Sequence, residues 1–110
     1  MQTHKSDKNL LELAAKAAGY QMDVDGRFFE KGEPTMENWN PLTDDGDALR
    51  LAVKIAEVQG YFPLLIDKVC AKTSAPDGTY IHEFVPIGGC FAAATRRAIV
   101  RAAAEIGKTL

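Results

Sequence analysis

Residues 91–106 read Phe-Ala-Ala-Ala-Thr-Arg-Arg-Ala-Ile-Val-Arg-Ala-Ala-Ala-Glu-Ile, and they dictate how closely the rest of the chain can pack. Apolar and small residues recur there at the spacing of one buried helical face. They are Phe91, Ala94, Thr95, Ala98, Ile99, Ala102 and Ile106. Gly107 follows, and we expect it to end the helix. The short alanine side chains predict a helix whose backbone lies close to its neighbours.

Two extended stretches come before this helix. Phe62–Thr73 and Thr79–Val85 are rich in β-branched and aromatic residues, and residues 74–78 between them carry Pro and Gly at turn positions. The pair Gly88-Gly89 then leads into the helix. We expect one antiparallel hairpin that feeds directly into the last helix.

The first part of the chain predicts another helix. It begins after a cap at Ser6 or Asp7 and runs to about Ala18, and Gly19 stands where a C-terminal glycine belongs. Its buried face consists of Leu10, Leu13, Ala14 and Ala17.

A second hairpin is predicted directly after that helix. Tyr20–Val24 and Arg27–Lys31 flank Asp25-Gly26, and a two-residue Asp-Gly turn between extended runs is a strong hairpin signal. Residues 32–42 carry Gly, Pro and Asn at positions that interrupt regular structure, so we expect a loop there.

A middle helix opens at Thr43 or Asp44 and ends at Gly60. Its predicted buried face is Leu49, Ala52, Val53 and Ala56, widened by Ala48, Leu51 and Ile55. Asp44, Asp45 and Asp47 crowd its first turn, where unpaired backbone N–H groups favour negative charge. A hard-cation site is the alternative, but the EF-hand spacing is missing, so capping is the preferred interpretation.

The predicted order is therefore α-β-β-α-β-β-α in a single α+β domain over residues 1–110, with the helices packed on a mostly antiparallel sheet as a sandwich. Because each alanine buries little area, the core depends on larger side chains. These are Phe28 or Phe29, Trp39, Phe62, Leu64, Ile66, Ile81, Phe84, Phe91 and Ile99. We expect modest stability, or help from self-association into a homo-oligomer.

Composition narrows the class of protein. Hydrophobic residues make up 46% and charged residues 25%, and the net charge is -2, the balance of an ordinary globular domain. No apolar run reaches the length of a membrane span, and residues 1–8 lack a signal-peptide core. The two cysteines, Cys70 and Cys90, predict free thiols in a reducing cytoplasm, with one bridge between them as the alternative. Without metal-ligand spacing, we expect no metal and no cofactor.

Three stretches together resemble the phage ABA sandwich domain family, a group of small proteins of phages and prophages. They are residues 10–19, Leu-Leu-Glu-Leu-Ala-Ala-Lys-Ala-Ala-Gly; residues 39–52, Trp-Asn-Pro-Leu-Thr-Asp-Asp-Gly-Asp-Ala-Leu-Arg-Leu-Ala; and residues 93–104, Ala-Ala-Thr-Arg-Arg-Ala-Ile-Val-Arg-Ala-Ala-Ala, about a third of the chain. The resemblance implies helices against a sheet, a bacterial host and an accessory role such as modulating host defence. It brings no reaction and no catalytic residue.

Trp39 is a candidate binding residue because an exposed tryptophan can stack on a base or anchor a partner. The preferred interpretation is structural: Trp39 and Leu42 dock the chain on the core as it leads into the middle helix.

Arg96, Arg97 and Arg101 lie on one side of the last helix and form a candidate surface for phosphates or an acidic partner. From Gly88 onward there are four basic residues and one acidic residue, whereas residues 23–47 hold eight acidic and two basic ones. No aromatic residue is interleaved among the arginines to stack bases, so we expect no nucleic-acid partner. The preferred interpretation is a solvated face with Arg101 paired to Glu105.

The turn Gly88-Gly89-Cys90 could present backbone N–H groups and a reactive thiol to an anion. Tyr80 and His82 alternate with Ile81 and Glu83 on the preceding strand, so they form either a wet aromatic surface or part of the core. A nucleophilic pair would need His82 beside Cys70 or Cys90, and a strand-to-helix turn needs glycine anyway.

We therefore expect a non-enzymatic phage or prophage accessory protein, without catalytic residues, that binds a host protein or a small ligand. Its candidate binding residues are Trp39, Tyr80, His82, Cys90, Arg96, Arg97 and Arg101. The alternative is a small-ligand or nucleotide-binding module, or a minor enzyme, with its site near Gly88-Gly89-Cys90.

Overall fold

The computed structural model describes residues 5–59, 64–66, 70–74, 80–84 and 90–110. For residues 5, 6, 58, 59, 64–66, 70–74, 80–82 and 84 it describes the backbone alone. The predicted core side chains of Phe62, Leu64, Ile66, Ile81 and Phe84 therefore lie outside the description, as does the turn Gly88-Gly89.

Three helices lie where the apolar spacing predicts them. They are α1 (Lys5–Ala17), α2 (Asp45–Gln59) and α3 (Phe91–Gly107). In the described part of the chain, none of these is long and apolar enough to cross a bilayer.

Gly107 has a different role from the predicted one. It is the last residue of α3 and is buried rather than standing beyond the helix. A Cβ atom on Gly107 would lie 2.1 Å from the carbonyl oxygen of Leu13 in α1. The residue is therefore glycine because two helix backbones meet there, and not because the chain needs a stop signal.

Gly19 ends α1 as predicted. It has a φ of +82°, and its N–H donates to the carbonyl of Lys16 at 3.1 Å. The N–H of Tyr20 donates to the carbonyl of Ala15 at 2.9 Å. This is a Schellman motif, which needs a left-handed residue and turns the chain sharply away from the helix.

The start of α2 confirms capping for Asp44, whereas the predicted capping role of Asp47 is wrong. The side chain of Asp44 accepts a hydrogen bond from the backbone N–H of Asp47 at 2.8 Å. The carboxylate of Asp47 in turn accepts from the backbone N–H of Asn40 at 2.9 Å. The first bond satisfies a donor that would otherwise lack a partner at the helix start. The second fastens the chain that leads into α2 to the first turn of the helix.

The strands that precede α3 differ from the prediction in number. Phe62–Thr73 is not one strand, because β3 (Leu64–Ile66) and β4 (Cys70–Ser74) run antiparallel to each other, with Leu64 opposite Thr73. The next strand, β5 (Tyr80–Phe84), pairs antiparallel with β4 and confirms the second half of the predicted hairpin.

The first hairpin forms with very short strands, β1 (Gln21–Met22) and β2 (Phe28–Phe29). Its turn is longer than the predicted two-residue turn. The N–H of Asp23 donates to the carbonyl of Arg27 at 2.8 Å, and the N–H of Gly26 donates to the carbonyl of Asp23 at 3.1 Å. Gly26 has a φ of +83°. A turn followed by a left-handed glycine makes a three-residue loop of the bulged type.

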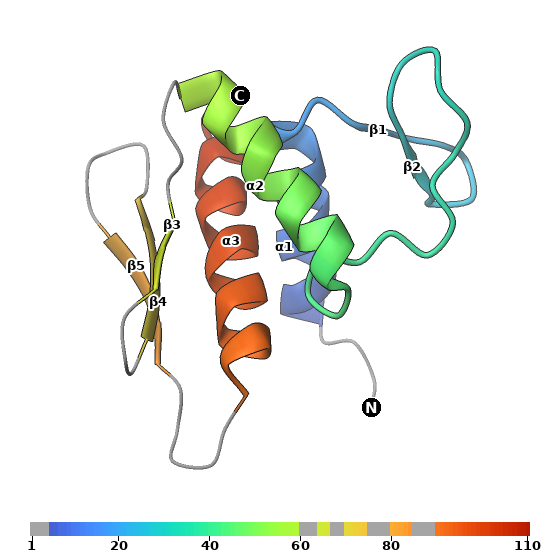
Figure 1. The fold of residues 1–110 in the computed structure, drawn as a ribbon. Coiled ribbons are helices and arrows are strands. Elements are labelled where there is room, and N and C mark those ends of the chain that lie inside the picture. Colours follow the sequence, from blue (N-terminus) through green and yellow to red (C-terminus); the bar gives the residue numbers. More distant parts are fainter. Residues whose placement is uncertain (1–4, 60–63, 67–69, 75–79, 85–89) are drawn as a thin grey trace.

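The elements form separate layers rather than helices on one sheet (Figure 1). The three-stranded sheet, in the order β3-β4-β5, packs against α3. Helices α1 and α2 pack against α3 as well, and the hairpin β1–β2 forms its own sheet beyond them. The α+β class with antiparallel pairing is confirmed, whereas the prediction of a single sheet is wrong.

The core between the helices is built largely from small residues. Ala14, Ala48 and Ala103 are all buried, and Leu51, Ile55 and Val100 are the largest fully buried aliphatic side chains. Trp39 and Ile99 belong to the core as predicted, and Phe28 packs against it. Phe91 was expected in the core, but half of it is exposed, because it lies in the first turn of α3.

Candidate functional site

Trp39 is 7% exposed and therefore offers no face to an external partner. Its ring meets Tyr20 edge-on at 5.5 Å and Phe28 at 5.1 Å between ring centroids. Its indole nitrogen is buried and has no hydrogen-bond partner among the described residues. This burial confirms the structural interpretation of Trp39, and Trp39 lacks the exposed ring face that stacking on a base or a partner would require.

Arg96 joins α3 to the chain that leads into α2. Its Nε donates to the carbonyl oxygen of Leu42 at 2.8 Å, and its Nη1 lies 2.5 Å from Oδ1 of Asp45. The side chain is 17% exposed. The guanidinium is therefore engaged inside the molecule, and the exposed carboxylate of Asp45 is its ion-pair partner.

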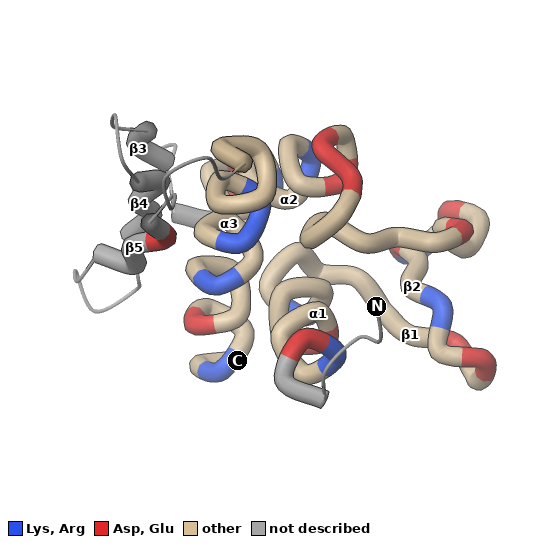
Figure 2. The backbone as a smooth tube through the Cα atoms, turned by 90° about the horizontal axis from the view of Figure 1, so that it is seen from below, with Lys and Arg blue, Asp and Glu red and all other residues tan. Residues whose placement is uncertain are grey.

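Arg97 and Arg101 face the sheet and α1 rather than standing free. Arg97 pairs with Asp7 at 3.3 Å and with Glu83 of β5 at 3.5 Å, and Arg101 pairs with the same Glu83. Figure 2 shows that basic residues recur along the length of α3. Its charges nevertheless meet carboxylates of this chain, which weakens any attraction for phosphates.

Cys90 is the N-terminal cap of α3, and its sulfur accepts a hydrogen bond from the backbone N–H of Ala93 at 3.4 Å. Its thiol is free and exposed, so a bridge between Cys70 and Cys90 is wrong. Tyr80 and His82 occupy β5 opposite Ser74 and Lys72, and their side chains lie outside the described part.

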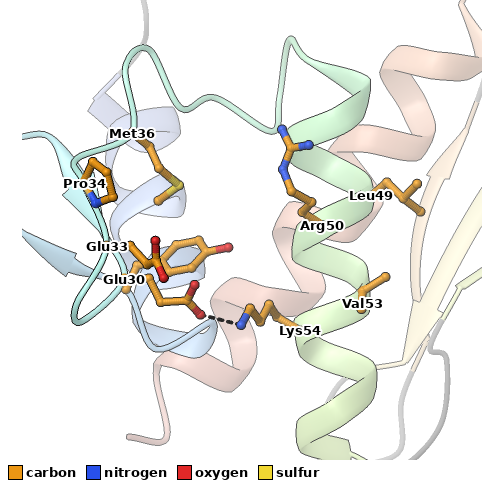
Figure 3. Close-up of a pocket in the computed structure, with 9 residues that line it drawn as sticks. Glu30, Glu33, Pro34, Met36, Leu49, Arg50, Val53 and Lys54 are labelled. Atoms are coloured by element: carbon orange, nitrogen blue, oxygen red, sulfur yellow. Dashed lines mark hydrogen bonds and ion pairs between the residues drawn. The ribbon is translucent and has the colours of Figure 1, made fainter.

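A pocket that the sequence did not predict lies between α2 and residues 20–36 (Figure 3). We call it the α2 pocket, and its volume is about 510 Å³. One wall is the loop after β2, and the other is the outer face of α2. Its lining consists of Tyr20, Glu30, Glu33, Pro34, Met36, Leu49, Arg50, Val53 and Lys54.

One ion pair joins the two walls of the α2 pocket. Oε1 of Glu30 lies 2.5 Å from Nζ of Lys54, and this hydrogen bond raises the pKa of Lys54. Burial raises the pKa of the Tyr20 phenol, and the charge of Lys54 offsets part of that rise. The phenol therefore stays neutral at physiological pH and can both donate and accept a hydrogen bond.

Arg50 also lines the pocket and is anchored by Asp47, whose Oδ1 lies 2.7 Å from its Nη2. This pair raises the pKa of Arg50. The bond uses one of the five guanidinium N–H groups, so donors remain for a ligand.

A shallower apolar hollow, which we call the Leu49–Phe91 groove, lies where α2 meets α3. Its volume is about 350 Å³. Leu49 and Phe91 are 58% and 50% exposed, and Arg96 and Asp45 lie in the lining. Leu49 lines both hollows, so the two adjoin along α2.

The missed signal was the width of the apolar stripe on α2. Leu49 and Val53 were predicted to be buried, but they are 58% and 43% exposed. The buried face consists of Ala48, Leu51, Ala52 and Ile55. A stripe too wide for one buried face leaves apolar residues on the surface, and those residues form the walls of both hollows.

No family model, no curated protein and no solved structure matches this chain. The function proposed below therefore rests on the residues of this chain.

Proposed function

We propose that the protein is a non-enzymatic binding protein that holds a small, largely apolar molecule in the α2 pocket. One observation supports this proposal. The pocket has the volume typical of ligand sites, and its apolar walls carry a few convergent polar groups. Tyr20, Arg50 and the pair Glu30–Lys54 are those groups, and they would orient a ligand whose body contacts Met36, Leu49 and Val53.

Binding suits these residues better than catalysis does. The lining contains no Cys, Ser or His, and the amine of Lys54 is protonated and paired with Glu30, so it is a poor nucleophile. Glu30 is held by Lys54, and the raised pKa of Tyr20 keeps its proton in place. A general base needs a free acceptor near neutral pH, and neither group is suited to that role. The remaining carboxylate of the lining, Glu33, has no ion pair with any described residue, and we assign it to ligand binding.

A fragment screen by NMR tests the proposal. Small apolar compounds should shift the methyl signals of Met36, Leu49 and Val53, and Met36→Trp should abolish those shifts by filling the pocket. Leu110→Trp is the matched control, since Leu110 is exposed and lies outside the pocket. Shifts that are absent, or that survive Met36→Trp, would contradict the proposal.

The Leu49–Phe91 groove supports a second candidate function, binding of a partner protein. Two large, exposed apolar side chains, Leu49 and Phe91, suit a partner with an apolar anchor, beside the ion pair of Asp45 and Arg96. A partner captured by the wild-type protein and by Met36→Trp, but lost with Phe91→Ser, would establish the groove as its site. Retention by Phe91→Ser would contradict this function.

We infer the cellular location and the origin of the protein from its resemblance to the phage ABA sandwich domain family. We place the protein in the cytoplasm of a bacterial host that carries the phage or prophage, where its ligand or partner belongs to the host. The sandwich architecture of that family is also part of the proposal, with α3 between the sheet and the other helices.

A further inference from the structure

The two walls of the α2 pocket carry opposite charges that do not neutralise each other. Glu33 belongs to the loop wall and Arg50 to the helical wall (Figure 3). Within the described part of the chain, the Glu33 carboxylate has no hydrogen bond and no ion pair, and nothing joins it to Arg50. Arg50 keeps several N–H groups beyond its bond to Asp47.

The other two charged residues of the pocket, Glu30 and Lys54, are less available to bind a ligand. Glu30 and Lys54 satisfy each other at 2.5 Å, and a ligand that used either would first have to break that pair. Glu33 and Arg50 can accept a ligand without such a loss. The surface between them is provided by Pro34, Met36, Leu49 and Val53, and it is apolar.

We propose that the α2 pocket selects a zwitterion with an apolar body, such as a short apolar peptide with free ends or an apolar amino acid. The ammonium group pairs with the carboxylate of Glu33, and the carboxylate accepts N–H bonds from Arg50. The apolar side chains fill the space between the walls. This inference rests on the proposed function, because it names the ligand class of the same pocket.

Charge complementarity is what favours a zwitterion over a simple anion or cation. An anion would meet the carboxylate of Glu33, and a cation would meet the guanidinium of Arg50, so each would experience repulsion in part of the pocket. A molecule with both charges at its ends matches both walls at once. The side chains of Glu33 and Arg50 are both exposed, so each ion pair with the ligand contributes little affinity by itself. The preference for a zwitterion comes from forming both ion pairs at once.

The test uses leucyl-leucine in three forms: with free ends, N-acetylated, and amidated at the carboxyl end. Calorimetric titration of the wild-type protein should show the free form binding about threefold to fivefold more tightly than either blocked form. Free leucine, titrated in parallel, separates a single amino acid from a short peptide as the preferred size. Equal affinity for all forms would overturn the inference.

Two substitutions assign the ends of the ligand. Glu33→Gln should remove the advantage of the free amine and leave the advantage of the free carboxylate, and Arg50→Gln should do the reverse. Glu57→Gln is the control, because Glu57 lies exposed on α2 outside the pocket. Unchanged preferences in both variants would overturn the inference. If neutral fragments bind and the dipeptide does not, the zwitterion is wrong and the proposed function stands.

Discussion

At the residue scale, Gly107 carries the sharpest constraint in the described part of the chain. The carbonyl oxygen of Leu13 would lie 2.1 Å from any Cβ atom placed there, and that oxygen belongs to a helix backbone that cannot rotate away. We expect Gly107→Ala to push α1 and α3 apart and to lower the free energy of unfolding by about 2 kcal/mol. Urea denaturation measures this loss.

Gly46 supplies the matched control, since it is also a helical glycine. Its nearest potential contacts are Oδ2 of Asp44 at 3.2 Å and Nη2 of Arg50 at 3.3 Å, side-chain atoms that need to move by only a few tenths of an ångström and can keep their hydrogen bonds to Asp47. Gly46→Ala should leave stability unchanged or raise it by up to about 1 kcal/mol, the helix propensity of alanine. A loss at Gly46 as large as that at Gly107 would show that glycine matters for another reason.

Tyr20 predicts how stability depends on alkaline pH. Its folded-state pKa is raised by burial, so the unfolded chain releases the phenolic proton first as the pH rises past 10.0. The contribution of the neutral phenol is present below that pH and is lost above it. The wild-type protein should therefore lose stability relative to Tyr20→Phe between about pH 8 and about pH 11. Urea denaturation of both proteins across that range checks the sign, and parallel curves would contradict it.

At the scale of elements, Arg96 connects α3 to the chain that leads into α2. Its bond to the carbonyl of Leu42 is half-buried, whereas its partner Asp45 is 77% exposed. Arg96→Ala should cost about 2 kcal/mol of unfolding free energy because the carbonyl loses a charged donor. Asp45→Asn should cost only about 0.5 kcal/mol. Equal losses in thermal or urea denaturation would mean that the ion pair, and not the carbonyl bond, provides the stability.

The elements also show which patterns could be predicted and which could not. Helix positions followed from apolar spacing and from local signals such as Gly19 and Asp44, which act within one turn. The break of Phe62–Thr73 into β3 and β4 was missed, although the charged pair Asp67-Lys68 interrupts its apolar residues between Ile66 and Cys70. The face of α2 that is buried depends on which neighbours arrive, and Leu49 and Val53 show that spacing alone does not decide it.

At the scale of the whole molecule, one carboxylate links the sheet to the helices. Glu83 of β5 pairs with Arg97 and Arg101 of α3, and it is 19% exposed. Glu83→Gln removes the carboxylate that Arg97 and Arg101 share, while Arg97 keeps its ion pair with Asp7, and it should lower stability by about 1 kcal/mol. Hydrogen exchange should quicken in β5 before it quickens in α1. Glu105→Gln, which breaks the exposed pair with Lys108, is the control and should change little.

The candidate site was the least predictable part of the molecule. The sequence analysis chose Trp39 and the arginines of α3 for their chemistry, and the structure engages Trp39, Arg96 and Arg97 in internal contacts. The α2 pocket joins Tyr20, Glu33 and Arg50 from separate segments, and no local spacing relates those positions. Residue type predicts what a side chain can do, whereas only the tertiary arrangement determines which side chains meet.

The backbone contact at Gly107 and the Schellman motif at Gly19 lie toward the same end of α1. Together they separate a rigid part, the pair α1 and α3, from a more movable part, residues 20–36. The close approach of the two backbones prevents α1 and α3 from sliding along each other, so we expect this helix pair to move as one rigid unit. Residues 20–36 are connected to α1 at Gly19, and the ion pair between Glu30 and Lys54 joins them to α2. If the α2 pocket widens to admit a larger ligand, we expect residues 20–36 to move outward while α1 and α3 keep their relative position.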